Sequence, residues 1–273
     1  MAIIWRHERT ITQQDGSQLK KSYQVRKAGN SLRLYTNGVF HSQYNPLYPI
    51  GGTIWDLLAL PALYSSHKIK RVLLLGVGGG AVIQQLKSLI DCDEIVGIEL
   101  DPIHIKIAKK YFKVIDQNNN SNNREGNKKR KHQCKVILHC ADAIKWLKEY
   151  RGKKFDLIID DLFFEEEGVP QRAVPADSKW CGLIAKHCHA NGTIVMNFDT
   201  HAALKGCAFM SDPKLIKDIK DRQKLLMPGY DNRVAAFYRK DIDHDVFQSR
   251  IESLNKNHKG TIKKRMNAKV RAF

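Results

Sequence analysis

Short apolar runs alternate with polar residues through the N-terminal part of the chain, which is the pattern of antiparallel strands. The predicted strands are Ser22–Lys27, Ser31–Tyr35 and Val39–Tyr44. Asn37-Gly38 separates the last two, and an Asn-Gly pair tolerates the positive φ values of a tight hairpin turn. We therefore expect a small antiparallel sheet of β-hairpins over residues 1–50, too small to be stable without a neighbour.

An apolar helix is predicted over Thr53–Tyr64, bent or broken near Pro61. From Lys70 onward, strands alternate with helices, which indicates a parallel sheet. The run Val72–Leu75 is apolar at every position, as expected for a strand buried on both of its faces. The further predicted elements are helix Ala81–Ile90, strand Glu94–Leu100, helix Pro102–Tyr111, strand Lys135–His139, helix Asp142–Tyr150, strand Phe155–Asp160, helix Ala176–His189, strand Thr193–Phe198, helix Asp212–Asp221 and strand Arg233–Arg239, the last antiparallel at the edge of the sheet.

Polar segments interrupt this pattern. Asp116–Gln133 has no apolar residue to bury, which is typical of a disordered surface insertion. We expect the tail after Lys259 to have the same character, and a helix from about Asp243 to Lys256 to precede it. The pattern predicts an α/β protein with three parts: an N-terminal β-hairpin domain (1–50), a Rossmann-like domain (51–240) with an insertion at about 116–133, and a basic C-terminal helix and tail (241–273).

The chain is strongly basic, with 46 Lys and Arg against 28 Asp and Glu and a net charge of +18. Part of this charge lies in the insertion, at Arg124 and Lys128–Lys131. Arg250–Phe273 adds eight basic residues against one acid. Such segments attract polyanions, so RNA, DNA or an acidic protein is a possible partner. A generally basic, solvated surface explains the charge equally well, because no nucleic-acid-binding module accompanies it.

The six cysteines form no C-x-x-C pair, so we expect reduced thiols rather than a disulfide framework. His187-Cys188-His189 has no second ligand pair at the spacing of a metal site, and we predict no metal. No apolar run reaches the roughly 18 residues of a membrane-spanning helix. The N-terminus has no cationic head before an apolar stretch. These features predict a cytoplasmic protein.

A glycine-rich loop stands between the buried strand Val72–Leu75 and the following helix. Glycine lets the backbone turn sharply and approach a ligand closely, and the helix N-terminus offers free N–H groups. Glu99 ends the next predicted strand, where a carboxylate can accept hydrogen bonds from both hydroxyls of a ribose. The sequence therefore predicts a nucleoside-binding site whose loop residues are Gly76, Gly78, Gly79 and Gly80.

Later acids favour S-adenosylmethionine (AdoMet) over NAD, whose fingerprint the loop also fits. Asp142 follows the third strand of the α/β region, where AdoMet-binding folds place a carboxylate near the adenine. Asp160 and Asp161 end the next strand, at the sheet edge where ligands collect. Each of these acids could instead be a helix or turn cap, so the prediction rests on their recurrence at strand ends.

Four segments together resemble the spermidine synthase (aminopropyltransferase) family: Leu74–Ala81, Val96–Pro102, Ala141-Asp142 and Phe155–Asp161. The resemblance implies the fold of class I AdoMet-dependent methyltransferases, preceded by a β-hairpin domain. It also implies that Glu99 holds the ribose, that Asp142 contacts the adenine, and that Asp161 matches the first acid of the D-x-x-D-P catalytic motif.

The chain also departs from the family pattern. Gly79 replaces the acid of the G-G-G-D-G-G loop, and Phe164 replaces the second acid of D-x-x-D-P. Tyr44–Gly51 stands where the family has D-E-x-x-Y-H-E. Polyamines carry several positive charges, and binding them calls for several placed carboxylates. Glu165–Glu167 could replace these acids, although a triple acid in a loop is usually solvated.

We expect a transferase that acts from a sulfonium donor on an unidentified acceptor, with Asp161, or Asp160, orienting or deprotonating that acceptor. Successive strand residues face opposite ways, and register with the family motif favours Asp161 for the site. The missing acids favour methyl transfer from AdoMet, since a glycine at position 79 leaves room for the carboxylate of that donor. The alternatives are aminopropyl transfer from decarboxylated AdoMet and a non-catalytic nucleoside- or RNA-binding protein.

Three further side chains are candidates for the cleft, although a packing or surface role is the more common one for each of them: His41, Tyr44 and His201. The segment Phe163–Val174 and the N-terminal hairpins are the expected walls of the acceptor pocket. The hairpin sheet is also a possible homodimer surface.

Overall fold

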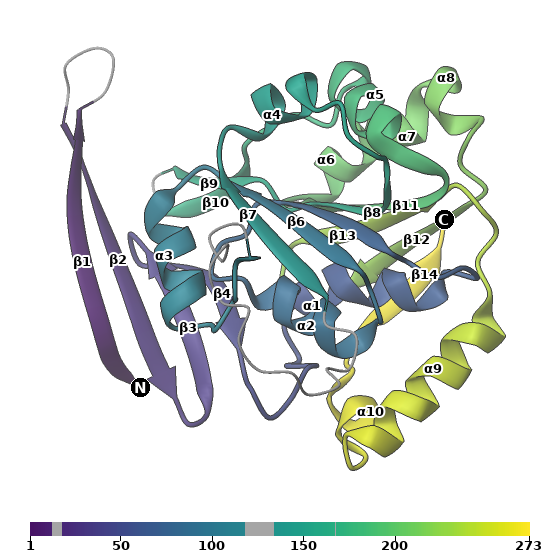
Figure 1. Cartoon of the computed structure of the whole chain (residues 1–273). Helices are drawn as coiled ribbons and strands as arrows, with labels where there is room; N and C mark the ends of the chain where they lie inside the picture. Colours follow the sequence, from purple (N-terminus) through teal and green to yellow (C-terminus); the bar gives the residue numbers. More distant parts are fainter. Residues whose placement is uncertain (13–17, 118–133, 167) are drawn as a thin grey trace.

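The computed structural model describes residues 1–12, 18–117, 134–166 and 168–273. It begins with four strands: β1 (Ala2–Thr12), β2 (Gln18–Ala28), β3 (Ser31–Thr36) and β4 (Val39–Tyr44). They form an antiparallel sheet in the order β1-β2-β3-β4, apart from the larger sheet (Figure 1). At the turn before β4, Asn37 and Gly38 have φ values of 50° and 83°. The predicted hairpin is therefore confirmed.

The second sheet has eight strands in the order β14-β12-β13-β11-β8-β5-β6-β7. The five strands from β11 to β7 are parallel to one another, whereas β13, β12 and β14 are each antiparallel to their neighbours. Their bounds are β5 Arg71–Leu75, β6 Glu94–Glu99, β7 Lys135–Cys140, β8 Phe155–Asp160, β11 Cys188–Phe198, β12 Asp221–Leu226, β13 Arg233–Tyr238 and β14 Lys269–Ala272. This confirms the α/β class and the parallel sheet.

Helices cover both faces of this sheet (Figure 1). One face packs against α4 to α8, and the other against α1, the 3₁₀ helix η1, α2, α9 and α10. The bounds are α1 Ile54–Ala59, η1 Leu60–Tyr64, α2 Ala81–Leu89, α3 Pro102–Lys110, α4 Ala143–Glu149, α5 Ser178–His187, α6 His201–Lys205, α7 Ala208–Ser211, α8 Pro213–Ile216, α9 His244–Asn257 and α10 Thr261–Arg265.

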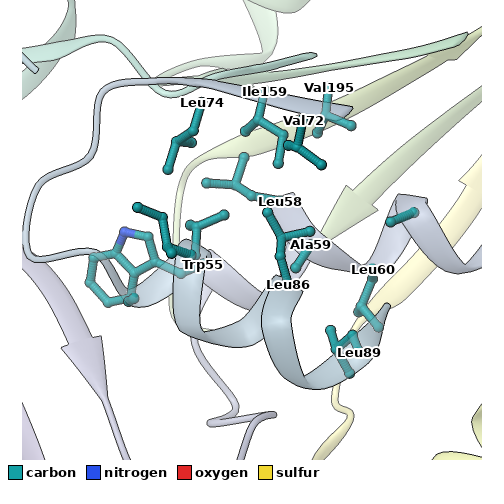
Figure 2. Packing of buried hydrophobic residues seen from close by; sticks show 14 of the residues in the cluster. Trp55, Leu58, Ala59, Leu60, Val72, Leu74, Leu86, Leu89, Ile159 and Val195 are labelled. Carbon is teal, nitrogen blue, oxygen red and sulfur yellow. The ribbon is translucent and has the colours of Figure 1, made fainter. Parts of the chain in front are cut away.

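The parallel strands are apolar throughout because each one faces two cores. In β5, Val72 and Leu74 belong to the core under α1 and α2, while Leu73 and Leu75 belong to the core under α4 and α5. Figure 2 shows the first core, in which Leu58 and Leu86 pack toward the sheet among other apolar side chains: Trp55, Ala59, Leu60, Leu89, Val72, Leu74, Ile159 and Val195.

The C-terminal part is more ordered than its polarity suggests. The tail after Lys259 was expected to be solvated, but it forms α10 and then β14. Its few apolar side chains explain this correction, because Ile262 is buried and Val270 packs against the same core. Another correction concerns the helix expected over Asp212–Asp221. It stops at Ile216, and Asp221 begins β12.

The strand Arg233–Arg239 was expected at the edge of the sheet. The corresponding β13 is antiparallel, as predicted, but β12 and β14 extend the sheet beyond it. The segment expected as a pocket wall forms a further hairpin, made of β9 (Phe163–Glu166) and β10 (Val169–Arg172). Residues 118–133 of the predicted insertion are not among the residues that the structure describes. Among the helices that the structure describes, none combines the length and the apolar character needed to cross a membrane.

The C-terminal helix α9 is anchored on η1 by two contacts. The rings of Phe247 and Tyr64 stack with their centroids 3.9 Å apart, and Arg250 donates hydrogen bonds to the carbonyls of Leu63 and Ser65. We expect Phe247→Ala to lower the free energy of unfolding by about 3 kcal/mol, measured by urea denaturation, because a buried aromatic ring is removed.

The matched control is Gln248→Ala at the neighbouring exposed position, which is expected to change stability very little. A loss below about 1 kcal/mol in Phe247→Ala would show that α9 is not part of the folded core.

Candidate active site

The glycine loop follows β5 and leads into α2. Gly76 has a φ of 86°, which favours glycine. A side chain at this position would also collide with the backbone carbonyl of Asp161. The Asp161 N–H in turn donates to the Leu75 carbonyl at 2.8 Å. The loop and the acid at the end of β8 are therefore in direct backbone contact.

Glu99, the last residue of β6, is largely buried and holds this loop in place. Its Oε2 accepts hydrogen bonds from the N–H groups of Val77 at 3.0 Å and Gly78 at 2.8 Å. Its Oε1 accepts from the Asp101 N–H at 2.9 Å and lies 3.6 Å from Nδ1 of His104. Burial acts to raise the pKa of Glu99, but these donors outweigh it and the pKa lies below its ordinary value.

The two acids after β8 have different surroundings. Asp160 is fully buried, and its Oδ2 accepts from Arg172 Nη2 at 2.7 Å and from Trp180 Nε1 at 2.8 Å. Asp161 accepts from Asn197 Nδ2 at 2.8 Å. Burial of the Asp161 carboxyl raises its pKa to about 7, against the hydrogen bond from Asn197. Of this pair, Asp161 thus has the pKa of a general base near neutral pH.

A cavity of about 1680 Å³ lies between the N-terminal sheet and the carboxyl ends of the parallel strands, where α/β folds bind ligands. It brings together most of the predicted site residues, namely Gly76, Gly78, Glu99, Asp142 and Asp161. The remaining ones do not line it. Asp160 faces the core beside Arg172, and Gly79 and Gly80 contact protein atoms instead.

The position of Asp142 is compatible with both of the roles considered for it, a helix cap and a ligand contact. Its Oδ1 caps α4 by accepting from the Lys145 N–H at 2.8 Å, and its exposed side chain also lines the cavity. Capping occupies one oxygen, which leaves the other free for a ligand. The contact with adenine remains a prediction.

Gly79 does not leave open space for a donor carboxylate, contrary to the expectation from the sequence. A Cβ atom at this position would lie 2.8 Å from the ring of Phe112 and 2.9 Å from Cβ of Ser42. Both neighbours are buried. The missing acid is therefore accompanied by packing that fills its place, which residue spacing alone could not indicate.

Among the three candidate cleft residues, His41 lines the cavity, whereas Tyr44 and His201 do not. The Nε2 atom of His41 is shielded from solvent and has no hydrogen-bond partner among the described residues. Burial, together with the nearby His104, lowers the pKa of His41 to about 4. Its imidazole is neutral at physiological pH and can donate or accept a hydrogen bond.

Three asparagines whose contacts sequence reasoning missed hold Asp161 and the β9–β10 hairpin in place. Asn232 Nδ2 donates to Asn197 Oδ1 at 3.1 Å, and Asn197 donates to Asp161. Glu165, from β9, lines the cavity and accepts from Asn37 Nδ2 of the N-terminal sheet at 2.7 Å. The position of Asn197 near the end of a strand was the only available signal. The side chain of Glu166 and the whole of Glu167 lie outside the described residues.

Comparison with known proteins gives a consistent result. Residues 56–225 match the family model described as the spermine/spermidine synthase domain. A polyamine aminopropyltransferase of Prochlorococcus marinus (strain MIT 9301) is 28% identical over 106 residues, covering 39% of this chain and 34% of that protein. A spermine synthase of Saccharomyces cerevisiae is 23% identical over 178 residues, covering 64% and 52%. The matches thus span a third to a half of these relatives.

Solved structures show the same fold over a longer stretch. The spermidine synthase from Thermotoga maritima has a TM-score of 0.60 at 15% identity, covering 93% of this chain and 78% of that one. A probable spermidine synthase from Corynebacterium glutamicum has a TM-score of 0.62 at 14% identity, covering 92% and 88%. These likenesses support the predicted sheet and the hairpin domain before it.

Restoring the family acid should damage this chain. We expect Gly79→Asp to lower the free energy of unfolding by more than about 2 kcal/mol, because the new side chain meets Phe112 and Ser42 and places a carboxylate in an apolar site. Urea denaturation measures the loss. Gly182→Asp is the control, since a Cβ there has no neighbour within 4 Å. Equal stability of Gly79→Asp and the wild type would show that Phe112 moves aside.

The raised pKa of Asp161 makes stability depend on pH. Its pKa is raised from 3.8 to about 7 in the folded protein, so the folded state binds the proton more tightly, and its contribution to stability is lost as the pH rises from about 4 through 7. Asp161→Asn should therefore raise the melting temperature at pH 8 clearly more than at pH 5. An equal shift at both pH values would contradict the raised pKa.

Proposed function

Because the chain belongs to the spermine/spermidine synthase family, we propose that it transfers an aminopropyl group from decarboxylated AdoMet to an amine. The observation that carries the proposal is the placement of Asp161. Asp161 lines the cavity, its carboxyl has a pKa raised to about 7, and its backbone contacts the glycine loop. The relatives named as polyamine aminopropyltransferases favour aminopropyl transfer over methyl transfer.

The cavity fits the nucleoside part of such a donor. Glycine at position 76 keeps the loop free of side chains beside Asp161. Glu99 would accept hydrogen bonds from the ribose hydroxyls. These hydroxyls would share the Glu99 oxygens with the loop N–H groups that already donate to them. Asp142 would accept from the adenine amino group. The bound donor supplies a sulfonium that already carries its leaving group, so the chain has to position both partners and remove a proton.

Asp161 would take the proton from the acceptor amine. An ammonium group has no lone pair with which to attack, and a carboxylate with a pKa near 7 accepts a proton more readily than an ordinary aspartate. Asn197 donates to Oδ1 of Asp161 through its Nδ2, so Oδ2 would take the proton. Glu165 is a second carboxylate of the cavity and would attract a further positive charge on the same molecule.

Methyl transfer from AdoMet is the second candidate. Two replaced acids favour it. Phe164, which is 43% exposed, stands where the family motif has its second acid, and Gly79 stands where the family loop has an acid. With fewer carboxylates in the cavity, a multiply charged acceptor gains less electrostatic stabilisation.

Product analysis separates the two reactions. The protein is incubated with either donor and a set of mono-, di- and triamines, and the nucleoside product is identified by mass spectrometry. Methylthioadenosine from decarboxylated AdoMet supports the proposal, and S-adenosylhomocysteine from AdoMet supports the second candidate. If neither product forms, and calorimetry detects no binding of either donor, the proposed function is wrong.

Asp161→Asn should lower kcat at least about a hundredfold while donor affinity in calorimetry stays within a few-fold. In the wild type, kcat/KM should rise with pH through about 7, because Asp161 must be ionised to accept the proton. Glu149→Gln, at an exposed position on α4, serves as the control with unchanged activity. Full activity of Asp161→Asn would remove this residue from the mechanism.

A further inference from the structure

The last two strands of the large sheet give it a basic face. In the pairing of β12 with β14, Lys224 lies opposite Arg271, and Leu226 lies opposite Lys269. Lys224 is also opposite Ala235 of β13, so these side chains extend from the sheet face that packs against α4 to α8. On this face Lys269 and Arg271 of β14 are exposed, and Lys224 of β12 is half-buried.

Further cations converge on this area. The pKa of His201, at the start of α6, is lowered first by partial desolvation and then by three neighbouring charges, those of Lys205, Lys224 and Arg233. We define the basic edge face by its five charged residues: Lys205, Lys224, Arg233, Lys269 and Arg271. In the part of the chain that the structure describes, none of the five is joined to an acid by an ion pair.

The pair Lys224–Arg271 is electrostatically unfavourable in the free protein. Like charges directly opposite each other on antiparallel strands destabilise a sheet, and neither of these side chains forms an ion pair with a carboxylate of the described residues. An anionic ligand would remove this repulsion. The basic edge face also adjoins the proposed active site, because Arg233 follows Asn232, which lines the cavity.

An aromatic side chain lies among these charges. Phe273 is 39% exposed, and the Lys224 Nζ lies 5.7 Å from the centroid of its ring. A sheet surface that offers cations for phosphates and an exposed ring for base stacking suits a single strand of nucleic acid. An acidic peptide would use the cations but would leave the ring without a stacking partner.

We propose that the basic edge face binds single-stranded RNA next to the active-site cavity. The five cations contact phosphates of the RNA, and the ring of Phe273 stacks on an unpaired base. This binding is independent of the transfer reaction. It also changes the role of the C-terminal tail, since the basic residues of the tail act from β14 and deletion of the tail would disrupt the sheet.

Basic residues on edge strands have another common role, which is to prevent edge-to-edge aggregation of sheets. That role requires charge but no ligand, and it predicts no contribution of individual cations to RNA affinity. The two explanations therefore differ in a measurable quantity.

The test is fluorescence anisotropy of a labelled uridine-rich RNA of about twelve nucleotides, titrated with the full chain between roughly 50 and 200 mM salt. We expect Lys224→Glu/Arg271→Glu to weaken binding at least tenfold. The slope of log K against log salt should become shallower by about 1.4, since each single-strand phosphate contact contributes about 0.7. Lys179→Glu/Lys186→Glu, which makes the same charge change at exposed positions of α5, should change affinity less than threefold.

A second variant guards against misfolding. Lys224→Gln/Arg271→Gln removes the repulsion, so its melting temperature should equal or exceed that of the wild type, while RNA affinity still falls. Phe273→Ala should weaken RNA binding without changing the salt slope. Wild-type affinity in the glutamine variant, or an equal loss in the α5 control, would overturn the proposal. So would equal or tighter binding of polyglutamate or of a DNA strand of matching sequence.

Discussion

The site depends on the carboxylate of Glu99. This side chain accepts hydrogen bonds from N–H groups of the glycine loop and of the segment after β6, so it joins the ends of the neighbouring strands β5 and β6. It is buried, and a buried carboxylate is stable as an anion only when donors surround it. The geometry of the loop and the ionisation of Glu99 therefore depend on each other. Any ligand that uses this acid must replace or share the bonds that shape its own binding site.

The N-terminal sheet is tied to the same region by polar contacts. Thr36 Oγ1 lies 2.9 Å from Nε2 of His104, and the other side of that imidazole faces Glu99. Asp101, which caps α3, accepts from Lys21 Nζ at 2.8 Å and from the Tyr23 hydroxyl at 2.7 Å. A sheet too small to be stable alone thus gains its stability where it closes the cavity.

The sequence predicted what depends on local pattern, and missed what depends on packing. The buried strand Val72–Leu75, the glycine loop and the acids at strand ends follow from periodicity and position, and the structure has them there. The strand β14 could not be predicted, because a short basic segment becomes a strand only when Val270 finds a core. Strand alternation predicted that one of Asp160 and Asp161 faces the cavity, and register with the family motif favoured Asp161. The role of Asn197 could not be predicted in this way, since it arises from contact between distant strands.

The packing around Gly79 makes positions 79 and 112 interdependent. An acid at position 79 and the buried ring of Phe112 exclude each other, because the Cβ of the first would overlap the second. A side chain at position 79 therefore calls for a smaller residue at position 112, and a variant of this loop has to be designed as a pair of substitutions rather than as one.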